Sequence, residues 1–366
     1  MATALKQQRI PELDGLRGVA VILVISFHYL NNQLVDATGF TGKLIGKVTS
    51  FGWVGVDLFF ILSGFLIGTI LIQNKHSKNY FSTFYIRRIV RIVPNYFLLI
   101  LIFLTLTAVP YFSDNYFLTG NNVIPVWSYF MMVHNLFMAH LNNLGNSAMS
   151  VTWSIGIEEQ FYIIFPFIVY FLNEKWLPWI LGCAIILAVI FRMQYNNWIP
   201  PYVLLHCRMD AISLGAIIAY LNNKYDLVAW VNRYFKWVMG MLTLNIFVCA
   251  YKYYRFQDLG YMRNTYFGIF FSICLIFALT YKKTIYAACL RNKILMWIGS
   301  ISYSLYLFHY MILGLFQHFA GNGLGLRNVK DVIITSIALI VSLLFSWALY
   351  LKLETPMVKI GKRFKY

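Results

Sequence analysis

The sequence predicts an all-α fold: one polytopic membrane helical bundle of about ten transmembrane helices, with both termini in the cytoplasm. Three observations predict it. Of the 366 residues, 60% are hydrophobic and 12% are charged, whereas about one-quarter of a soluble domain is charged. Apolar runs of about 20 residues, the length that crosses a bilayer, recur from end to end. Basic residues gather between these runs, which is where membrane topology places them.

Ten apolar runs are long enough to span the membrane. They cover residues 14–34, 51–73, 88–109, 150–172, 176–194, 202–222, 233–251, 264–281, 296–319 and 331–353. With the N-terminus in the cytoplasm, the cytoplasmic segments hold 20 Lys and Arg residues and the outer loops hold seven. This asymmetry follows the positive-inside rule. We therefore expect a single transmembrane domain over residues 1–366.

One long segment could change this topology. Residues 110–149 contain no Lys or Arg, as expected of an outer loop, and loops of this length are usually functional. Within it, residues 125–141 are apolar enough for an eleventh span. That span would invert all later helices and leave 12 basic residues inside against 15 outside. The ten-span topology agrees better with the charges, so we expect 125–141 to be a re-entrant or interfacial segment.

The net charge of +17 does not indicate nucleic-acid binding, because the basic residues lie in the short connectors between apolar runs. The five cysteines are scattered without paired spacing, so we expect no disulfide framework. The sequence contains no HExxH motif and no Cys/His cluster, so we expect no metal site.

Titratable residues inside the predicted spans are the first functional signal. Such groups are costly in a bilayer and mark functional sites by default. Five spans place them at a similar depth. These residues are His28, Asp57, Glu158, Glu159, Arg208, Asp210 and His309. Because each would cost roughly 3 kcal/mol if unpaired in lipid, we expect them to surround a hydrated chamber that opens outward.

A second signal lies at the cytoplasmic end of the third span. The stretch FYIRRIVRIVP carries Arg87, Arg88 and Arg91, and the last two fall on one helix face. Guanidinium groups suit phosphate binding. Arg17 lies eleven residues before His28, which is close to three helical turns, or about 16 Å. We therefore expect one polar path that joins a basic mouth at Arg17 to the outer chamber at His28.

Seven motifs in order carry a family resemblance. They read RGVAVILVISFH, GVDLFFILSGFLI, RRIVRIVP, TWSIGIEEQFY, RMDAISLGA, SISYSLYLFH and ETP, and together they extend over nearly the whole chain. With these motifs the sequence resembles the acyltransferase 3 family of integral membrane O-acyltransferases. That family includes bacterial O-acetylases of lipopolysaccharide and peptidoglycan.

The resemblance implies an enzyme of the bacterial cytoplasmic membrane that takes an acetyl or other short acyl group from cytoplasmic acyl-CoA. The implied acceptor is a hydroxyl of an extracytoplasmic glycan or glycolipid, such as lipopolysaccharide. Arg17, Arg87, Arg88 and Arg91 would bind the donor, and His28 would act in the reaction. Membrane lipids and a cell-surface or lipid-linked saccharide are the expected partners. We expect no fused esterase-like domain, so a two-component transfer would need a separate extracytoplasmic partner.

His28 is our candidate general base, because imidazole titrates near neutral pH. Asp57 could hold its tautomer, as an acidic residue does in a catalytic triad. Glu158 is the third catalytic candidate. We favour a direct transfer, while a covalent intermediate on His28 or Ser63 stays an alternative.

Six further residues are candidates for acceptor binding. They are Trp153, Glu159, Arg208, Asp210, Tyr303 and His309. The adjacent Glu158 and Glu159 point about 100° apart on a helix. We therefore expect one of them to face the chamber and the other to pair with Arg208.

Other interpretations stay open for several candidates. Arg17 could pair with Asp14, Arg87 could only set topology, and Arg208 with Asp210 could form a structural ion pair. Two other functions also stay open. A transporter or flippase would predict inverted repeats, which the sequence lacks, and an acyltransferase for a small lipid or secondary metabolite would differ only in its acceptor.

Overall fold

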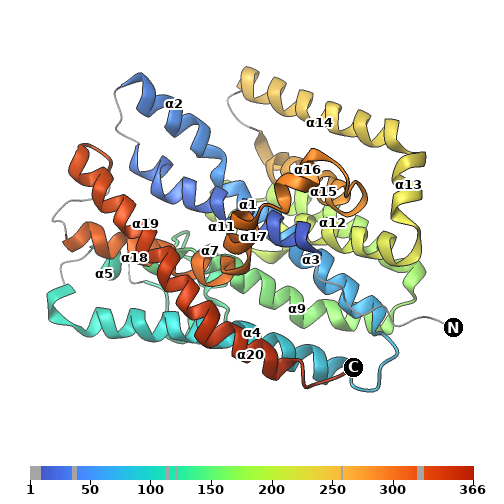
Figure 1. Ribbon diagram of the computed structural model, residues 1–366, viewed down its shortest axis with the longest axis horizontal. Coiled ribbons are helices and arrows are strands. Elements are labelled where there is room, and N and C mark those ends of the chain that lie inside the picture. Colours follow the sequence, from blue (N-terminus) through green and yellow to red (C-terminus); the bar gives the residue numbers. More distant parts are fainter. Residues whose placement is uncertain (1–9, 35–38, 113–115, 121–122, 257–258, 320–324) are drawn as a thin grey trace.

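The computed structural model describes residues 10–34, 39–112, 116–120, 123–256, 259–319 and 325–366. Within these ranges every regular element is a helix (Figure 1). Eight described helical segments are long and apolar enough to cross a membrane, and two bent helix pairs bring the candidate spans to as many as ten. The all-α, multi-pass membrane fold predicted from the apolar runs is therefore confirmed.

The long helices follow the predicted spans. They are α1 (Pro11–Tyr29), α3 (Gly55–Gln73), α4 (Tyr80–Ala108), α9 (Trp153–Phe171), α10 (Leu177–Arg192), α12 (Leu205–Lys224), α15 (Arg263–Thr280) and α19 (Val329–Leu349). The bent pairs are α13 (Leu227–Arg233) with α14 (Phe235–Phe256), at 73°, and α17 (Lys293–Ser300) with α18 (Ser302–Phe319), at 74°.

Shorter elements connect the long helices. The short α-helices are α2 (Phe40–Thr49), α5 (Tyr116–Thr119), α6 (Val126–Phe130), α7 (His134–His140), α8 (Ser147–Ser150), α11 (Ile199–Val203), α16 (Ile285–Leu290) and α20 (Thr355–Gly361). Five 3-10 turns are Asn31–Gln33, Ser50–Val54, Pro110–Phe112, Glu174–Trp176 and Gly260–Met262, and a π-helical turn, Tyr350–Glu354, joins α19 to α20.

Two predicted spans differ from the structure. Helix α4 begins at Tyr80, before the predicted boundary at residue 88, because its first turns pack against α20. The predicted span 296–319 is broken at Ile301 between α17 and α18. At this break Gly299 fits against the carbonyl of Asp14. Helix α17 therefore packs on the first turns of α1, and α18 takes a different direction.

Residues 125–141 fold into α6 and α7, helices of five and seven residues. Met132, in the left-handed region with φ 56°, lies in the turn between them. Both helices are much shorter than the bilayer is thick. Helix α7 packs against α9 and α11, so the segment lies against the bundle as two short turns of helix.

Helices α3 and α12 form the centre of the bundle, where their backbones come close together. A side chain on Gly64 would meet the carbonyl of Ile212, and one on Gly215 would meet the carbonyl of Ile61. Small residues that let backbones approach are a common basis of helix packing in membranes. Helices α1, α9, α10 and α15 pack around this pair.

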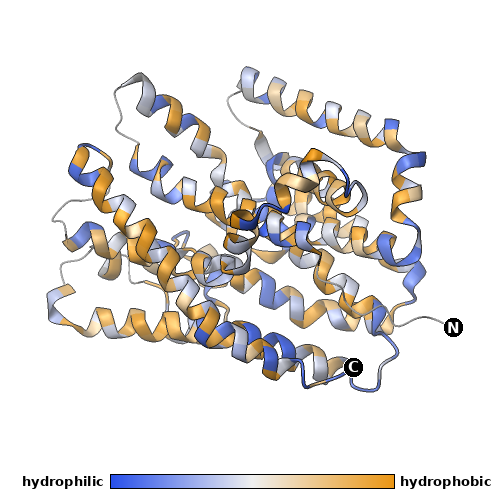
Figure 2. Ribbon diagram, in the orientation of Figure 1, coloured by the Kyte–Doolittle hydropathy of each residue, from blue (hydrophilic) through white to orange (hydrophobic). Residues whose placement is uncertain are grey.

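The outer helices present apolar surface. In Figure 1, α14 runs along the upper edge of the molecule and α4 along the lower edge, and Figure 2 shows hydrophobic residues along both. Trp237, Leu244 and Phe247 of α14 are exposed. Exposed apolar surface of this extent marks a membrane-contacting face.

The close α3–α12 approach makes a testable prediction. We expect Gly64→Val to lower the unfolding temperature of the purified, detergent-solubilised protein, because the new side chain would press on the α12 backbone. Overpacking of this kind costs about 1–3 kcal/mol. Gly182→Val on α10 is the matched control, since no described atom beyond its own helix lies within 4 Å of its Cβ position. Equal unfolding temperatures for the two variants would contradict the prediction.

Candidate active site

Two cavities of different chemistry meet inside the bundle. The first, which we name the arginine cavity, has a volume of about 120 Å³. Its polar lining residues are Arg17, Ser63, Arg88, Arg91, Ser154, Glu158, Glu159, Tyr162, Ser302, Tyr303 and Tyr306. They come from α1, α3, α4, α9 and α18, so the cavity exists only in the assembled bundle.

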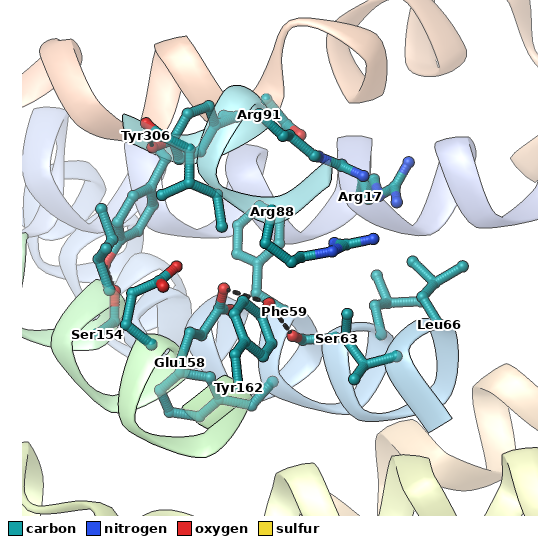
Figure 3. Close-up of a pocket in the computed structure, with 18 of the residues that line it drawn as sticks. Arg17, Phe59, Ser63, Leu66, Arg88, Arg91, Ser154, Glu158, Tyr162 and Tyr306 are labelled. Carbon is teal, nitrogen blue, oxygen red and sulfur yellow. Dashed lines mark hydrogen bonds between the residues drawn. The ribbon is translucent and has the colours of Figure 1, made fainter. Parts of the chain in front are cut away.

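Three guanidinium groups gather at the arginine cavity (Figure 3). Arg88 and Arg91 lie one turn apart on α4, and Arg17 comes from α1. Arg17 also donates to Asp14, with 3.1 Å between Nη1 and Oδ1, so pairing with Asp14 and a place at the cavity are compatible. The buried Nε of Arg88 has no hydrogen-bond partner among the described residues. This leaves it as a donor for an anion.

Two carboxylates face these arginines. The hydroxyl of Tyr162 donates to Glu158 Oε2 at 2.9 Å, and the hydroxyl of Ser63 lies 2.5 Å from that of Tyr162. Because the proton of Tyr162 goes to Glu158, Ser63 is the donor in the second bond. Glu159 lines the same cavity. We expected one of the two glutamates to face the outer chamber with His28, whereas both line the arginine cavity instead.

The second cavity, which we name the histidine cavity, has a volume of about 370 Å³. His28 lines it together with many aromatic side chains. These are Phe27, Trp53, Trp153, Trp198, Tyr202, Tyr306 and Tyr310. Asn32, Ser150 and Arg263 add polar groups, and the guanidinium of Arg263 lies 4.6 Å from the centre of the Trp53 ring.

The ring of His28 is held by α1 and α18. Its Nδ1 lies 3.0 Å from the carbonyl oxygen of Val24 and 3.2 Å from Nε2 of His309. The ring of Tyr310 packs on it with 4.5 Å between ring centres. His309 is fully buried, so it contacts His28 rather than lining either cavity.

The two cavities share a wall. Val56 on α3 and Tyr306 on α18 line both of them. The hydroxyl of Tyr306 donates to the carbonyl of Val151 at 2.9 Å and lies 2.8 Å from Ser154 Oγ. The side chains of Val56 and Tyr306 therefore lie between the two cavities, which places Arg17 and His28 in successive cavities along α1.

The structure corrects the expected partner of Asp57. Its Oδ1 accepts from Arg208 Nη2 at 2.8 Å, and both side chains are buried. The guanidinium of Arg208 lies about 5.5 Å from the ring centres of Trp153 and Tyr202. Asp57 thus pairs with Arg208 instead of orienting His28, and Arg208 pairs with Asp57 instead of a glutamate. Arg208 lies behind the aromatic wall of the histidine cavity.

Asp210 belongs to another buried cluster. Its Oδ2 lies 2.9 Å from Arg192 Nη1 and accepts from Thr265 at 2.6 Å. Arg192 also donates to the carbonyls of Cys207 and Tyr261. This cluster ties α10, α12 and α15 together. Arg208 and Asp210 therefore do not form the suggested ion pair with each other. Arg208 pairs with Asp57 on α3, and Asp210 pairs with Arg192 on α10.

Arg87 was predicted to bind the donor and Tyr303 the acceptor. In the structure both side chains donate to backbone carbonyls. Arg87 donates through Nε and Nη2 to the carbonyl of Phe364, at 3.0 and 2.6 Å, and its guanidinium lies over the ring of Tyr366. It therefore holds the C-terminal segment against α4. Tyr303 donates to the carbonyl of Ile92 at 2.8 Å and lines the arginine cavity.

Some residues of the two cavities were not among our candidate site residues. Tyr162 and Tyr306 lie at the centre of the arginine cavity and in the shared wall. Both occur in the motifs quoted above, and Tyr306 stands three residues before His309, on the same helix face. Tyr202 and Arg263 lie in segments where the sequence shows no such signal.

The buried pair of Asp57 and Arg208 predicts a stability effect. We expect Arg208→Met to lower the unfolding temperature strongly, because it leaves Asp57 buried and unpaired, a loss of about 3–5 kcal/mol. The double variant Asp57→Asn with Arg208→Met should recover much of this loss. Thermal unfolding of the purified proteins measures both. An Arg208→Met protein as stable as the wild type would instead indicate a binding role for Arg208.

Comparisons with known proteins identify the family of this chain. Residues 10–351 match the sequence model of the acyltransferase 3 family, described as an acyltransferase domain. SACOL0978 of Staphylococcus aureus strain COL, provisionally named as an O-acetyltransferase, is 27% identical over 379 residues, covering 97% of this chain and 58% of that protein. O-acetyltransferase OatA of S. aureus strain NCTC 8325 is 26% identical over 373 residues, covering 96% and 58%.

The chain therefore spans somewhat more than half the length of these relatives. No solved structure matches it. The family match covers almost the whole chain, including every residue that lines the two cavities. This integral, multi-pass membrane protein belongs to the acyltransferase 3 family.

Proposed function

We propose that this protein is a membrane O-acyltransferase that moves an acetyl or other short acyl group from acyl-CoA to a hydroxyl of a glycan or glycolipid. The observation that carries the proposal is the shared wall of Val56 and Tyr306. It separates a cavity lined by three arginines from one lined by His28 and aromatic rings. A donor and an acceptor that enter from opposite sides would meet there.

The arginine cavity suits the donor. Guanidinium groups bind phosphates through paired hydrogen bonds, and Arg17, Arg88 and Arg91 supply three of them at one place. We therefore place the phosphates of the donor against these arginines and its acyl end toward the shared wall. In the predicted topology the basic mouth at Arg17 faces the cytoplasm of a bacterial cell.

The histidine cavity suits the acceptor. Small-molecule sites are commonly apolar, aromatic hollows with a few polar groups that fix orientation. Trp53, Trp153 and Tyr202 provide apolar faces, while Asn32 and Arg263 provide hydrogen-bonding groups. An extracytoplasmic saccharide, free or linked to a lipid, would present both kinds of surface.

His28 would act as the general base. As the acceptor oxygen forms a bond to the thioester carbonyl carbon, His28 takes the hydroxyl proton, and the carbon–sulfur bond breaks. His28 then returns the proton to the departing thiolate. His28 lines the cavity proposed for the acceptor, and a base there would be on the side where the hydroxyl arrives.

The role of His28 predicts a loss of activity. We expect His28→Ala to lower acyl transfer by about 10²–10⁴-fold, the usual contribution of a general base. Purified protein in nanodiscs would be incubated with radiolabelled acetyl-CoA, and the label released or transferred would be measured. His140→Ala, at an exposed position on α7, is the control. Unchanged turnover in a folded His28→Ala protein would remove His28 from the mechanism.

The donor site predicts a contrast between neighbouring arginines. We expect Arg88→Gln to raise the KM for acetyl-CoA by about 10–100-fold, since a hydrogen bond to a charged group contributes about 1.5–3 kcal/mol. Arg87→Gln should leave this KM nearly unchanged, because Arg87 binds the carbonyl of Phe364. Steady-state kinetics with varied acetyl-CoA separates the two. A larger effect of Arg87→Gln would refute the assignment of the donor to the arginine cavity.

A further inference from the structure

We infer that His309 is the positioning residue for His28: it fixes the tautomer of His28 so that Nε2 is the atom that accepts the substrate proton. This inference rests on the proposed function, in which His28 is the base. It replaces the role in acceptor binding that the sequence suggested for His309.

The first step concerns Nδ1 of His309. This atom lies 2.7 Å from the carbonyl oxygen of Tyr306 and 3.0 Å from that of Leu305. Carbonyl oxygens only accept hydrogen bonds. Nδ1 of His309 must therefore carry a proton.

The second step concerns the charge of His309. Its side chain is fully buried, and a buried charge is costly unless it is paired. The buried carboxylates Asp57 and Asp210 pair with arginines instead. His309 is thus neutral, and a neutral imidazole with its proton on Nδ1 has a lone pair on Nε2.

The third step transfers this constraint to His28. Nδ1 of His28 faces two acceptors, Nε2 of His309 at 3.2 Å and the carbonyl of Val24 at 3.0 Å. It must therefore carry the proton, which leaves the lone pair of the neutral ring on Nε2. When His28 gains a second proton, the hydrogen bond to His309 becomes charge-assisted and stronger. His309 would do for His28 what a buried aspartate does in a catalytic triad.

The fold holds this pair in register. Tyr29, next to His28, donates to the backbone carbonyl of His309 at 2.9 Å and lies 2.8 Å from Ser342 Oγ. Tyr310, next to His309, packs against the ring of His28. Tyr29 therefore links α1 to α18 and α19, and Tyr310 links α18 to the ring of His28 on α1.

Two amide variants test the inference. The side-chain oxygen of Gln can take the place of Nε2 of a histidine, whereas the shorter Asn reaches only the place of Nδ1. We expect His309→Gln to keep most of the activity. We expect His309→Asn to lower kcat by about 10–100-fold, part of the about 10²–10⁴-fold that a general base supplies, with the KM for acetyl-CoA unchanged. Unfolding temperatures of both variants would show whether they fold.

A spectroscopic measurement tests the tautomer without any substrate. In protein labelled with 15N-histidine in nanodiscs, signals of His28 are assigned by their loss in His28→Gln. We expect a protonated Nδ1 and an unprotonated Nε2 in the wild type. In His309→Asn the Nδ1 of His28 keeps the Val24 carbonyl but loses its acceptor on α18, so the fraction of His28 that is protonated on Nε2 should increase.

The outcomes separate the two hypotheses. A His28 protonated on Nε2 in the wild type, or a folded His309→Asn protein with unchanged kcat and an unchanged tautomer, would overturn the inference. If the wild type shows the expected tautomer and His309→Asn changes it, but no acyl group is transferred, the proposed function fails while the control of the His28 tautomer by His309 stands.

Discussion

The ion pair of Asp57 and Arg208 is the interaction on which the site depends. A charge inside a membrane bundle must find a partner or water, and here two closely packed helices, α3 and α12, each supply one charge. The pair fixes α3 against α12. It also supports the aromatic wall of the histidine cavity, because the Arg208 guanidinium lies behind Trp153 and Tyr202.

The titratable groups of the membrane region divide into two sets. One set is paired and buried, as in the clusters of Asp57 with Arg208 and of Asp210 with Arg192. The other set faces a cavity, as do Arg88, Glu158 and His28. The paired set keeps the bundle rigid around the cavities. The cavity-facing set is available for chemistry, since these side chains line the space that a substrate could enter.

Much of this protein follows from the sequence alone. The length and number of apolar runs determine a bundle of about ten spans, because every backbone polar group in lipid must be satisfied within a helix. The eleven-residue spacing of Arg17 and His28 determines that they lie on one face of α1, and the structure places them in successive cavities. The motif order was sufficient to identify the family, which the match over residues 10–351 confirms.

The choice of partners was decided only by the tertiary structure. Depth in the membrane suggested that Asp57 and His28 could meet, but depth does not specify the rotation of a helix or its neighbours. Rotation places Asp57 against Arg208 and leaves His28 facing His309. Likewise, Arg87 and Arg88 are adjacent in sequence, yet about 100° of helical turn sends one to the C-terminal segment and the other to the cavity. Pairing depends on which faces meet after packing, and that information is distributed over all the helices.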